Sequence, residues 1–288
     1  MSYSFCIDNM TKSFGDFVLG PIDLTLEKGV SLGLIGANGA GKTTLLNCLS
    51  GLIIPNSGDI SILDRKLNLF DKTWKRQIGY ITDEPIFYEN WTGAKNLRFL
   101  SKYFPEWSKE FEDELIKRFN CPVNKKTRDL SKGERVMLAI ISVLARKPKL
   151  LLLDEPTAGL DPVNRSRLLE LLWDLLKEGE QSIFYSTHII SDVGNIAEEL
   201  VFINEGKLTL RTPKDSLTNK WRKMTFIHQD PALNLSSIVE SRIEGLKRLI
   251  VSSDYNVTLS ELREAKAEEI ETTRIGLDEI VVHILKEE

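Results

Sequence analysis

The sequence predicts an α/β fold with a mixed, mainly parallel sheet at its core, and two observations support this. Residues 30–35 are a mainly apolar run expected to form a buried strand, and residues 150–153 are a short, continuous apolar run of the kind found in parallel strands covered on both faces. Each run is followed by a helical pattern, the alternation expected of strand–helix–strand units. The chain has 288 residues, more than one typical domain, so we also expect a smaller appended domain.

The predicted elements follow this pattern along the chain. Residues 1–35 are expected to form strands, and the buried strand at 30–35 leads through a glycine-rich turn into a helix at 42–49. The other predicted strands are at 59–63, 149–155 and 182–186, with a hairpin at 201–210. The other predicted helices are at 134–145, 161–179, 190–200, 259–271 and 275–286, with two amphipathic segments around 91–100 and 111–119.

Changes of texture divide the chain. Residues of about 85–145 are mainly helical in pattern and interrupt the strand–helix alternation. After Pro213 the pattern changes to short alternating segments and a charged helix. The sequence therefore predicts one domain at 1–212, which includes a helical subdomain at about 85–145, and a small α+β domain at 213–288.

Composition excludes several classes of protein. The net charge of −4 argues against a binder of duplex nucleic acid, which needs a basic surface to neutralise phosphates. The longest nearly unbroken apolar stretch, 136–145, is far shorter than the roughly 20 residues of a membrane-spanning helix. Cys6, Cys48 and Cys121 are too far apart for a metal or disulfide framework, so we expect reduced thiols in a cytosolic protein.

The segment Gly36–Thr44 satisfies the G-x-x-x-x-G-K-[ST] motif between a buried strand and a helix, the context that this motif requires. Its backbone N–H groups and the helix N-terminus are suited to phosphate, Lys42 to the β- and γ-phosphates, and the Thr43 hydroxyl to Mg²⁺. A glycine-rich turn that binds nothing is the alternative. The residues expected to contact the nucleotide are Asn38, Gly39, Ala40, Gly41, Lys42, Thr43 and Thr44.

Two carboxylates end the strand at 149–155. Asp154 and Glu155 lie at the carboxyl edge of the sheet, where ligands bind in such folds. We expect Asp154 to hold Mg²⁺ and Glu155 to act as general base toward water. Alone, an acidic strand end is a weak signal; together with Lys42 it is strong.

Ser131 precedes the helix at 134–145 and has Glu134 three residues later. This spacing predicts a capping box, and a serine–glycine helix start is also an anion site. Both interpretations are compatible because one geometry serves both.

The chain resembles the ATP-binding subunit of an ABC transporter over residues 1–211. The resemblance is carried by four segments in this order: the phosphate loop, residues 130–134, residues 154–161 and Ser186–His188. The resemblance implies a P-loop NTPase fold with an N-terminal antiparallel β subdomain, an α-helical subdomain, and ATP and Mg²⁺ as cofactors. It also implies a head-to-tail dimer, homomeric or heteromeric, in which Ser131 and Gly133 contact the γ-phosphate of ATP bound to the other subunit.

Three further roles follow from the resemblance. His188 corresponds to the switch histidine at the γ-phosphate, although by itself it would be read as an ordinary histidine. Asp161 corresponds to the aspartate that communicates between the two sites. Phe14 corresponds to the aromatic that stacks on adenine, with a buried core residue as the alternative.

Two departures from the family pattern stand out. Asp83 occupies or adjoins the place of the glutamine that touches Mg²⁺ or its water, so we treat it as a metal-ligand candidate. Lys132 and Glu134 replace glycine and glutamine around Ser131 and Gly133.

The implied function is ATP hydrolysis that powers transport, most similar to bacterial ABC-2-type exporters. A separate polytopic permease would span the membrane, with this chain peripheral on its cytoplasmic face and no nucleic acid as partner. The helical subdomain and residues 83–91 are the expected docking surface. The alternatives are a translation factor or DNA-maintenance ATPase, disfavoured by the single phosphate loop and the absence of long heptads, and a regulatory module without turnover, disfavoured by Glu155. The transported substrate stays open.

Overall fold

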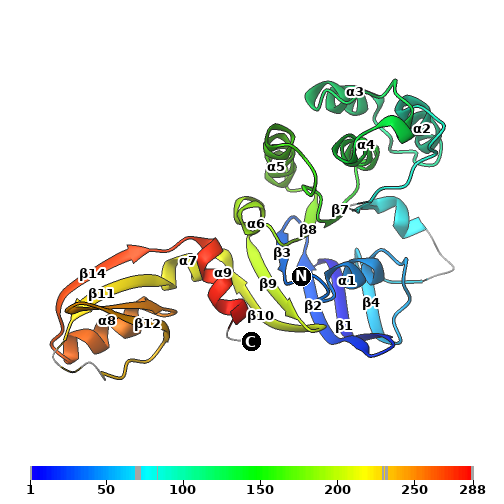
Figure 1. The fold of residues 1–288 in the computed structure, drawn as a ribbon. Coiled ribbons are helices and arrows are strands. Elements are labelled where there is room, and N and C mark those ends of the chain that lie inside the picture. Colours follow the sequence, from blue (N-terminus) through cyan, green and yellow to red (C-terminus); the bar gives the residue numbers. More distant parts are fainter. Residues whose placement is uncertain (1, 69–72, 83, 229, 231–232, 287–288) are drawn as a thin grey trace. The chain divides into compact units, whose positions relative to one another are not determined.

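The structure is a computed structural model that describes residues 2–68, 73–82, 84–228, 230 and 233–286. Its chain forms two compact units, residues 1–211 and residues 212–288. Figure 1 gives the course of the chain through both units.

Unit 1 begins with a four-stranded antiparallel sheet in the order β2-β1-β4-β5. Its strands are β1 (Tyr3–Phe14), β2 (Phe17–Glu27), β4 (Ser57–Ile62) and β5 (Arg65–Lys66). The central strand β1 pairs antiparallel with both β2 and β4. Phe5 and Ile7 are among the side chains that this sheet buries. This sheet is the antiparallel β subdomain that the resemblance implied.

The second sheet of unit 1 has six strands in the order β10-β9-β3-β8-β7-β6. They are β3 (Ser31–Ile35), β6 (Ile78–Ile81), β7 (Leu150–Asp154), β8 (Ser182–Thr187), β9 (Glu199–Asn204) and β10 (Lys207–Pro213). The strands from β9 through β6 are parallel, and every residue of β3 and β7 is buried. The predicted mixed, mainly parallel core is confirmed.

Helices α1 (Lys42–Leu49) and α6 (Ile190–Ile196) pack against this sheet, and α5 (Pro162–Lys177) packs against α6. The apolar side of α1 belongs to the same buried cluster as residues of β1, β3 and β7, so this core holds the start of α1 in place. The helix predicted at 190–200 is too long. It ends at Ile196 because β9, which pairs with β3, begins at Glu199.

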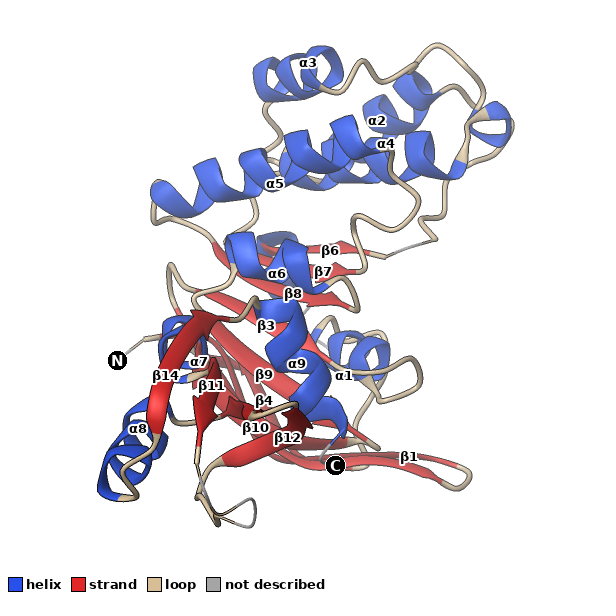
Figure 2. Ribbon diagram, turned by 60° about the vertical axis from the view of Figure 1, so that its left-hand side comes forward, coloured by secondary structure: helices blue, strands red, loops and turns tan. Residues whose placement is uncertain are grey.

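The helical part of unit 1 contains α2 (Gly93–Ser101), α3 (Lys109–Arg118) and α4 (Lys132–Leu144), with short 3₁₀ turns at Thr73–Gln77 and Thr127–Asp129. Thr92, Ser108 and Ser131 cap the three helices by accepting a backbone N–H bond. Residues 136–144 are all buried, as the apolar pattern of this helix indicated. Figure 2 shows these helices grouped with α5, apart from α1.

Unit 2 has a four-stranded antiparallel sheet in the order β12-β13-β11-β14. Its elements are α7 (Lys214–Lys220), β11 (Arg222–Ile227), β12 (Ile238–Glu244), β13 (Lys247–Ser252), α8 (Tyr255–Glu264), β14 (Glu268–Arg274) and α9 (Leu277–Lys286). Leu262 of α8 shares a buried cluster with Met224, Phe226 and Ile250 of the sheet.

One predicted helix in unit 2 is wrong. Residues 259–271 do not form one helix, because α8 ends at Glu264 and β14 begins at Glu268. Lys266 has φ of 56°, a turn conformation that no helix continues through, and β14 then pairs along β11. The sheet partner therefore overrides the helical propensity of this charged segment.

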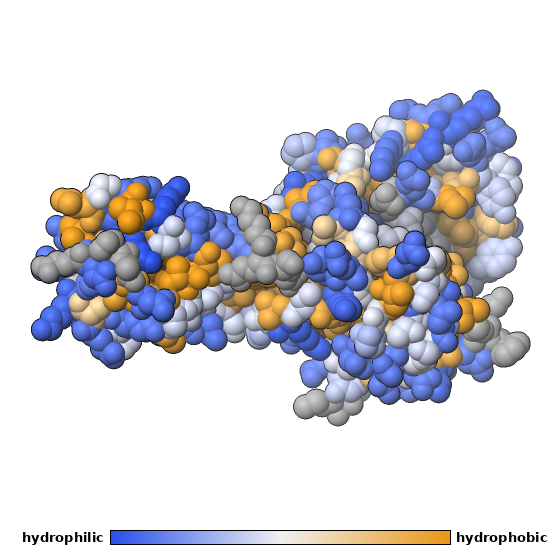
Figure 3. All heavy atoms as spheres, turned by 60° about the horizontal axis from the view of Figure 1, so that its bottom comes forward, coloured by the Kyte–Doolittle hydropathy of each residue, from blue (hydrophilic) through white to orange (hydrophobic). Residues whose placement is uncertain are grey.

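Within the described residues no helix has the length and apolar character needed to cross a bilayer. On the face drawn in Figure 3, hydrophobic residues form patches interrupted by hydrophilic ones. All three cysteines are free thiols, and burial raises the pKa of Cys48 to about 11 and that of Cys121 to about 12.

Candidate active site

The phosphate loop connects β3 to α1 and has the backbone shape of an anion cradle. Gly41, the N-cap of α1, has φ of 111°, a left-handed conformation that favours glycine. No side chain caps α1, and its first turn contains no acid. The positive end of the helix is thus left for a ligand, because no side chain of the helix itself neutralises it.

The remaining loop residues differ in exposure. Asn38 and Gly39 are exposed at the tip, whereas Ala40 is buried and accepts a hydrogen bond from the Gly206 amide through its carbonyl. Thr43 is exposed and Thr44 is half-buried on the first turn of α1. The loop therefore presents its tip and the Thr43 hydroxyl outward while its base is anchored to the β9–β10 turn.

Lys42 folds back over this loop and is 6% exposed. Its Nζ donates to the carbonyl oxygens of Gly36, at 2.8 Å, and Ala37, at 3.1 Å, and lies 3.8 Å from Oε1 of Glu155. Burial lowers the pKa of Lys42, while the charges of Glu155 and Asp154 act in the opposite direction. A phosphate arriving here would meet a desolvated ammonium already aimed into the loop.

Asp154 ends β7 and is 2% exposed. Because β7 and β8 are parallel with Asp154 opposite Ser186, the Ser186 hydroxyl can donate to Oδ1 of Asp154 at 2.6 Å. A carboxylate here, together with the exposed hydroxyl of Thr43, is an all-oxygen donor set. Such a set fits Mg²⁺, which commonly takes one or two protein oxygens and completes its shell with phosphate and water.

Glu155 is held by the end of β8. Its backbone has φ of 49°, and its amide donates to the carbonyl of Ser186. Oε2 of its side chain accepts from Oγ1 of Thr187 at 3.2 Å and from the His188 amide at 3.3 Å, and lies 2.8 Å from His188 Nδ1. A carboxylate placed between a lysine and a histidine can take a proton from a water beside the phosphate loop.

Ser131 and Gly133 lie elsewhere in the unit. Ser131 forms the predicted capping box with Glu134: its hydroxyl accepts from the Glu134 amide at 3.2 Å, and its own amide donates to Oε2 of Glu134 at 2.7 Å. Ser131 and Gly133 border a cavity of about 500 Å³. Its lining includes Gly159 and Asp161 but none of residues 36–44. The structure therefore does not bring Ser131 and Gly133 to the phosphate loop of the same chain.

Two other candidates complete the set. Phe14 lies at the end of β1 and is exposed, with Nζ of Lys12 5.0 Å from its ring centroid. The alternative of a buried core residue does not apply, and the ring is open for stacking. Asp83 lies outside the described residues.

Sequence reasoning missed the groups that hold the two carboxylates. It assigned no role to Ser186 and Thr187, which bond to Asp154 and Glu155, beyond their place in a motif. It also did not single out Asp192, a separate, fully buried carboxylate four residues after His188. Their position at the end of a strand adjacent to β7 could have indicated the first two. Nothing in the sequence pattern indicated Asp192, because its partners come from distant segments.

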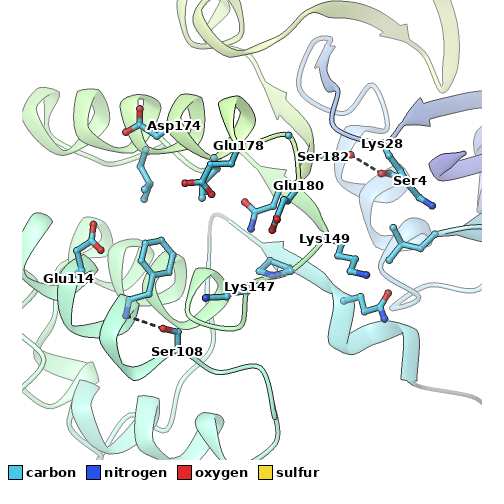
Figure 4. Close-up of a pocket in the computed structure, with 18 of the residues that line it drawn as sticks. Ser4, Lys28, Ser108, Glu114, Lys147, Lys149, Asp174, Glu178, Glu180 and Ser182 are labelled. Carbon is cyan, nitrogen blue, oxygen red and sulfur yellow. Dashed lines mark hydrogen bonds between the residues drawn. The ribbon is translucent and has the colours of Figure 1, made fainter.

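A second cavity of unit 1, about 1080 Å³, lies at the opposite edge of the sheet. Lys149 and Ser182, which border it, are at the amino ends of β7 and β8, whereas Asp154 and Thr187 are at the carboxyl ends. Figure 4 shows Glu178 and Glu180 facing it with lysines nearby. This charged cavity is separate from the phosphate loop and contains none of the predicted site residues.

The chain is similar to known proteins over most of its length. Residues 19–158 match the family described as ABC transporter. The ABC transporter ATP-binding protein YtrB of Bacillus subtilis (strain 168) is 32% identical over 275 residues, 93% of each chain. The bacitracin transport ATP-binding protein BcrA of Bacillus licheniformis is 35% identical over 218 residues, 75% of this chain and 71% of that protein. The solved ATP-binding subunit of an ABC transporter has a TM-score of 0.67 at 26% identity, covering 75% of this chain and 92% of that one.

Proposed function

The chain belongs to the ATP-binding proteins of ABC transporters, and from this membership we propose that it binds ATP with Mg²⁺ and drives a separate membrane permease. As the motifs predicted, it is an ATPase with a P-loop NTPase fold. We propose export as the direction of transport, as the resemblance to ABC-2-type exporters implies. We assign ATP binding to residues 1–212 and treat 213–288 as a separate small domain.

The phosphate loop supplies the binding energy for the nucleotide. The N–H groups at the start of α1 and Lys42 would hold the β- and γ-phosphates, and Phe14 would stack on the adenine. Thr43 and Asp154 would hold Mg²⁺, which when bound neutralises charge on the phosphate oxygens. Asp83 stays a candidate for the same ion.

Hydrolysis is assigned to Glu155, and one observation carries this assignment. The Glu155 carboxylate lies 3.8 Å from the Lys42 ammonium and 2.8 Å from His188 Nδ1, so it is at the phosphate end of the loop and fixed in orientation. It takes a proton from the attacking water, while the exposed ring of His188 reaches toward the γ-phosphate.

A second copy of an ATP-binding subunit is needed to complete the site. Ser131 and Gly133 border a cavity that excludes the phosphate loop of their own chain. They can therefore contact a γ-phosphate only when it is bound to another subunit. This supports a head-to-tail dimer, either of two copies of this chain or of this chain with a related one.

The permease contact is assigned to the helical part of unit 1. Ile86 is 95% exposed. Four aromatic rings on and next to α2 form a continuous cluster of stacked and edge-on pairs, comprising Tyr88, Trp91, Phe99 and Tyr103. Exposed apolar surface of this kind marks protein interfaces. Binding of a polytopic permease there would place the chain on the inner face of the cell membrane, and no nucleic acid is involved.

The test is the substitution Glu155→Gln in the full chain. It removes the base but keeps the shape, so we expect steady-state ATP hydrolysis to fall by roughly 10²- to 10⁴-fold. ATP affinity, measured by equilibrium binding of a fluorescent analogue, should change by less than about threefold. Wild-type hydrolysis in Glu155→Gln would overturn the assignment of the base, whereas loss of ATP binding would indicate a binding role instead.

A further inference from the structure

Asp192 is a fully buried carboxylate to which the proposed mechanism assigns no role. It lies on the first turn of α6, four residues after His188. Removing a carboxylate from water costs several kcal/mol unless charge and hydrogen bonds compensate it. The structure supplies that compensation from three other segments of unit 1.

Each oxygen of Asp192 has two donors. Oδ1 accepts from Nε of Arg165 at 2.7 Å and lies 2.6 Å from Nη2 of the same guanidinium. Oδ2 accepts from Oγ1 of Thr157 at 2.6 Å and from the Tyr185 hydroxyl at 3.3 Å. Burial raises the pKa of Tyr185 well above its usual range, and the charge of Asp192 adds to this, so the hydroxyl remains a donor.

The donors come from segments that carry the site. Thr157 lies two residues after Glu155, and Arg165 is on the first turns of α5, whose N-cap is Asp161. Tyr185 belongs to β8, three residues before His188. A single buried carboxylate thus fastens the segment that follows Glu155 to the segment that carries His188.

The link to the reacting groups is short. The Ile189 amide donates to Oγ1 of Thr187 at 2.9 Å, and this hydroxyl donates to Oε2 of Glu155 at 3.2 Å. The Asp192 amide in turn donates to the carbonyl of Ile189 at 3.1 Å. Movement of α6 away from α5 would therefore act on both contacts that orient Glu155, from Thr187 and from His188.

We propose that Asp192 is a positioning residue for hydrolysis, holding the loop after β7 and the loop after β8 together so that Glu155 and His188 keep their mutual geometry. The inference rests on the roles proposed for Glu155 and His188. Asp192 acts through these residues, and its chemistry is that of a fixed anion shared by Arg165 and Thr157.

The experiment compares Asp192→Asn with Asp174→Asn in the full chain. Asp174 is an exposed carboxylate on α5 that faces the charged cavity, so its amide variant removes the same charge away from the site. Because small displacements of a catalytic group are costly, we expect kcat of Asp192→Asn to fall roughly 10- to 100-fold. ATP affinity of Asp192→Asn should stay within about threefold of wild type, and Asp174→Asn should match wild type throughout.

A double-variant cycle separates positioning from general loss of stability. In a His188→Ala background, Asp192→Asn should reduce kcat by no more than about threefold further, because the contact that it protects is already absent. An undiminished 10- to 100-fold loss in that background would overturn the proposal. So would wild-type kcat in the single variant.

Hydrogen exchange gives a readout that does not depend on turnover. In Asp192→Asn, peptides covering 155–161 and 186–192 should exchange faster together, while a peptide within α4 keeps its wild-type rate. Unchanged exchange in both loops would contradict the proposal. If Glu155→Gln retains hydrolysis, the proposed function fails; if Glu155→Gln is inactive and Asp192→Asn behaves as wild type, only the positioning role fails.

Discussion

Nδ1 of His188 lies 2.8 Å from Oε2 of Glu155, although the two residues are 33 positions apart in the chain. The parallel pairing of β7 with β8 creates this contact, because it places the residues after Asp154 beside those after Ser186. The Glu155 carboxylate therefore has a fixed orientation before any nucleotide arrives. Preorganised groups of this kind avoid reorganisation during the reaction.

The first prediction concerns this contact. His188→Ala should reduce kcat for ATP hydrolysis by roughly 100-fold, because the carboxylate loses its shortest side-chain contact and the γ-phosphate loses the partner proposed for it. In a Glu155→Gln background, His188→Ala should lower kcat by no more than about threefold further. The effects of two residues that act as a unit on the rate are not additive. Steady-state ATPase assays of the four proteins test this, and multiplicative losses would contradict it.

The second prediction concerns the surface proposed to contact the permease, which consists of Ile86 and the aromatic cluster around α2. Ile86→Glu places a charge on the side chain of Ile86, which is 95% exposed, so folding should be unaffected while an apolar contact with the permease is lost. Co-purification of the polytopic partner from native membranes should be lost, with basal ATP hydrolysis unchanged. Leu246→Glu, at an 86% exposed position of unit 2, is the matched control and should retain the partner. Retention by both variants would place the docking surface elsewhere.

The third prediction concerns Gly133 and the backbone of Gly159. A Cβ at position 133 would lie 2.8 Å from the Gly159 carbonyl oxygen, closer than real Cβ atoms approach. Gly133→Ala should therefore lower the free energy of unfolding by about 1–3 kcal/mol even without nucleotide.

The control for this prediction is Gly276→Ala. A Cβ at position 276 would meet nothing within 4 Å, so we expect a change in the free energy of unfolding within about 0.5 kcal/mol. Urea denaturation of both variants measures the difference. Equal stability of Gly133→Ala and wild type would show that the loop around Gly159 yields without cost, leaving phosphate contact as the reason for glycine at position 133.

The fourth prediction concerns pH and the capping box. The backbone N–H bond from Ser131 lowers the pKa of Glu134, and Lys125 at 3.2 Å acts in the same direction. A carboxyl whose pKa is lowered by folding contributes stability above its ordinary pKa of about 4.3, and loses it as pH falls through the lowered value.

Glu134→Gln keeps an oxygen for the Ser131 amide but cannot titrate. We expect it to cost less than about 1 kcal/mol at neutral pH, because the lost ion pair with Lys125 is partly exposed. The difference from wild type should shrink as pH falls through the lowered pKa of Glu134. Urea denaturation of both proteins at neutral pH and at a pH below the lowered pKa of Glu134 tests this. A difference in the free energy of unfolding that stays constant between the two pH values would mean that Glu134 does not titrate with folding.

Much of the fold was readable from local pattern. The phosphate loop, the buried strands β3 and β7, the cap at Ser131 and the helix after Asp161 follow from residue spacing over a few positions. The two wrong helix boundaries lie where the pairing of a following strand determines the end of the helix. The ends of α6 and α8 depend on the pairing of β9 with β3 and of β14 with β11, which involves residues far away in sequence.

The sequence by itself predicted the chemistry. Lys42 and Thr43 occur in a motif of local spacing, and Asp154 and Glu155, at the end of a buried strand, are a strong signal when taken together with Lys42. Only the tertiary structure decided how that chemistry is held. The bond from Ser186 to Asp154, the contact of His188 with Glu155 and the burial of Asp192 between Thr157 and Arg165 all join distant segments. Such contacts are set by strand order and packing, and no short-range pattern encodes which segments become neighbours.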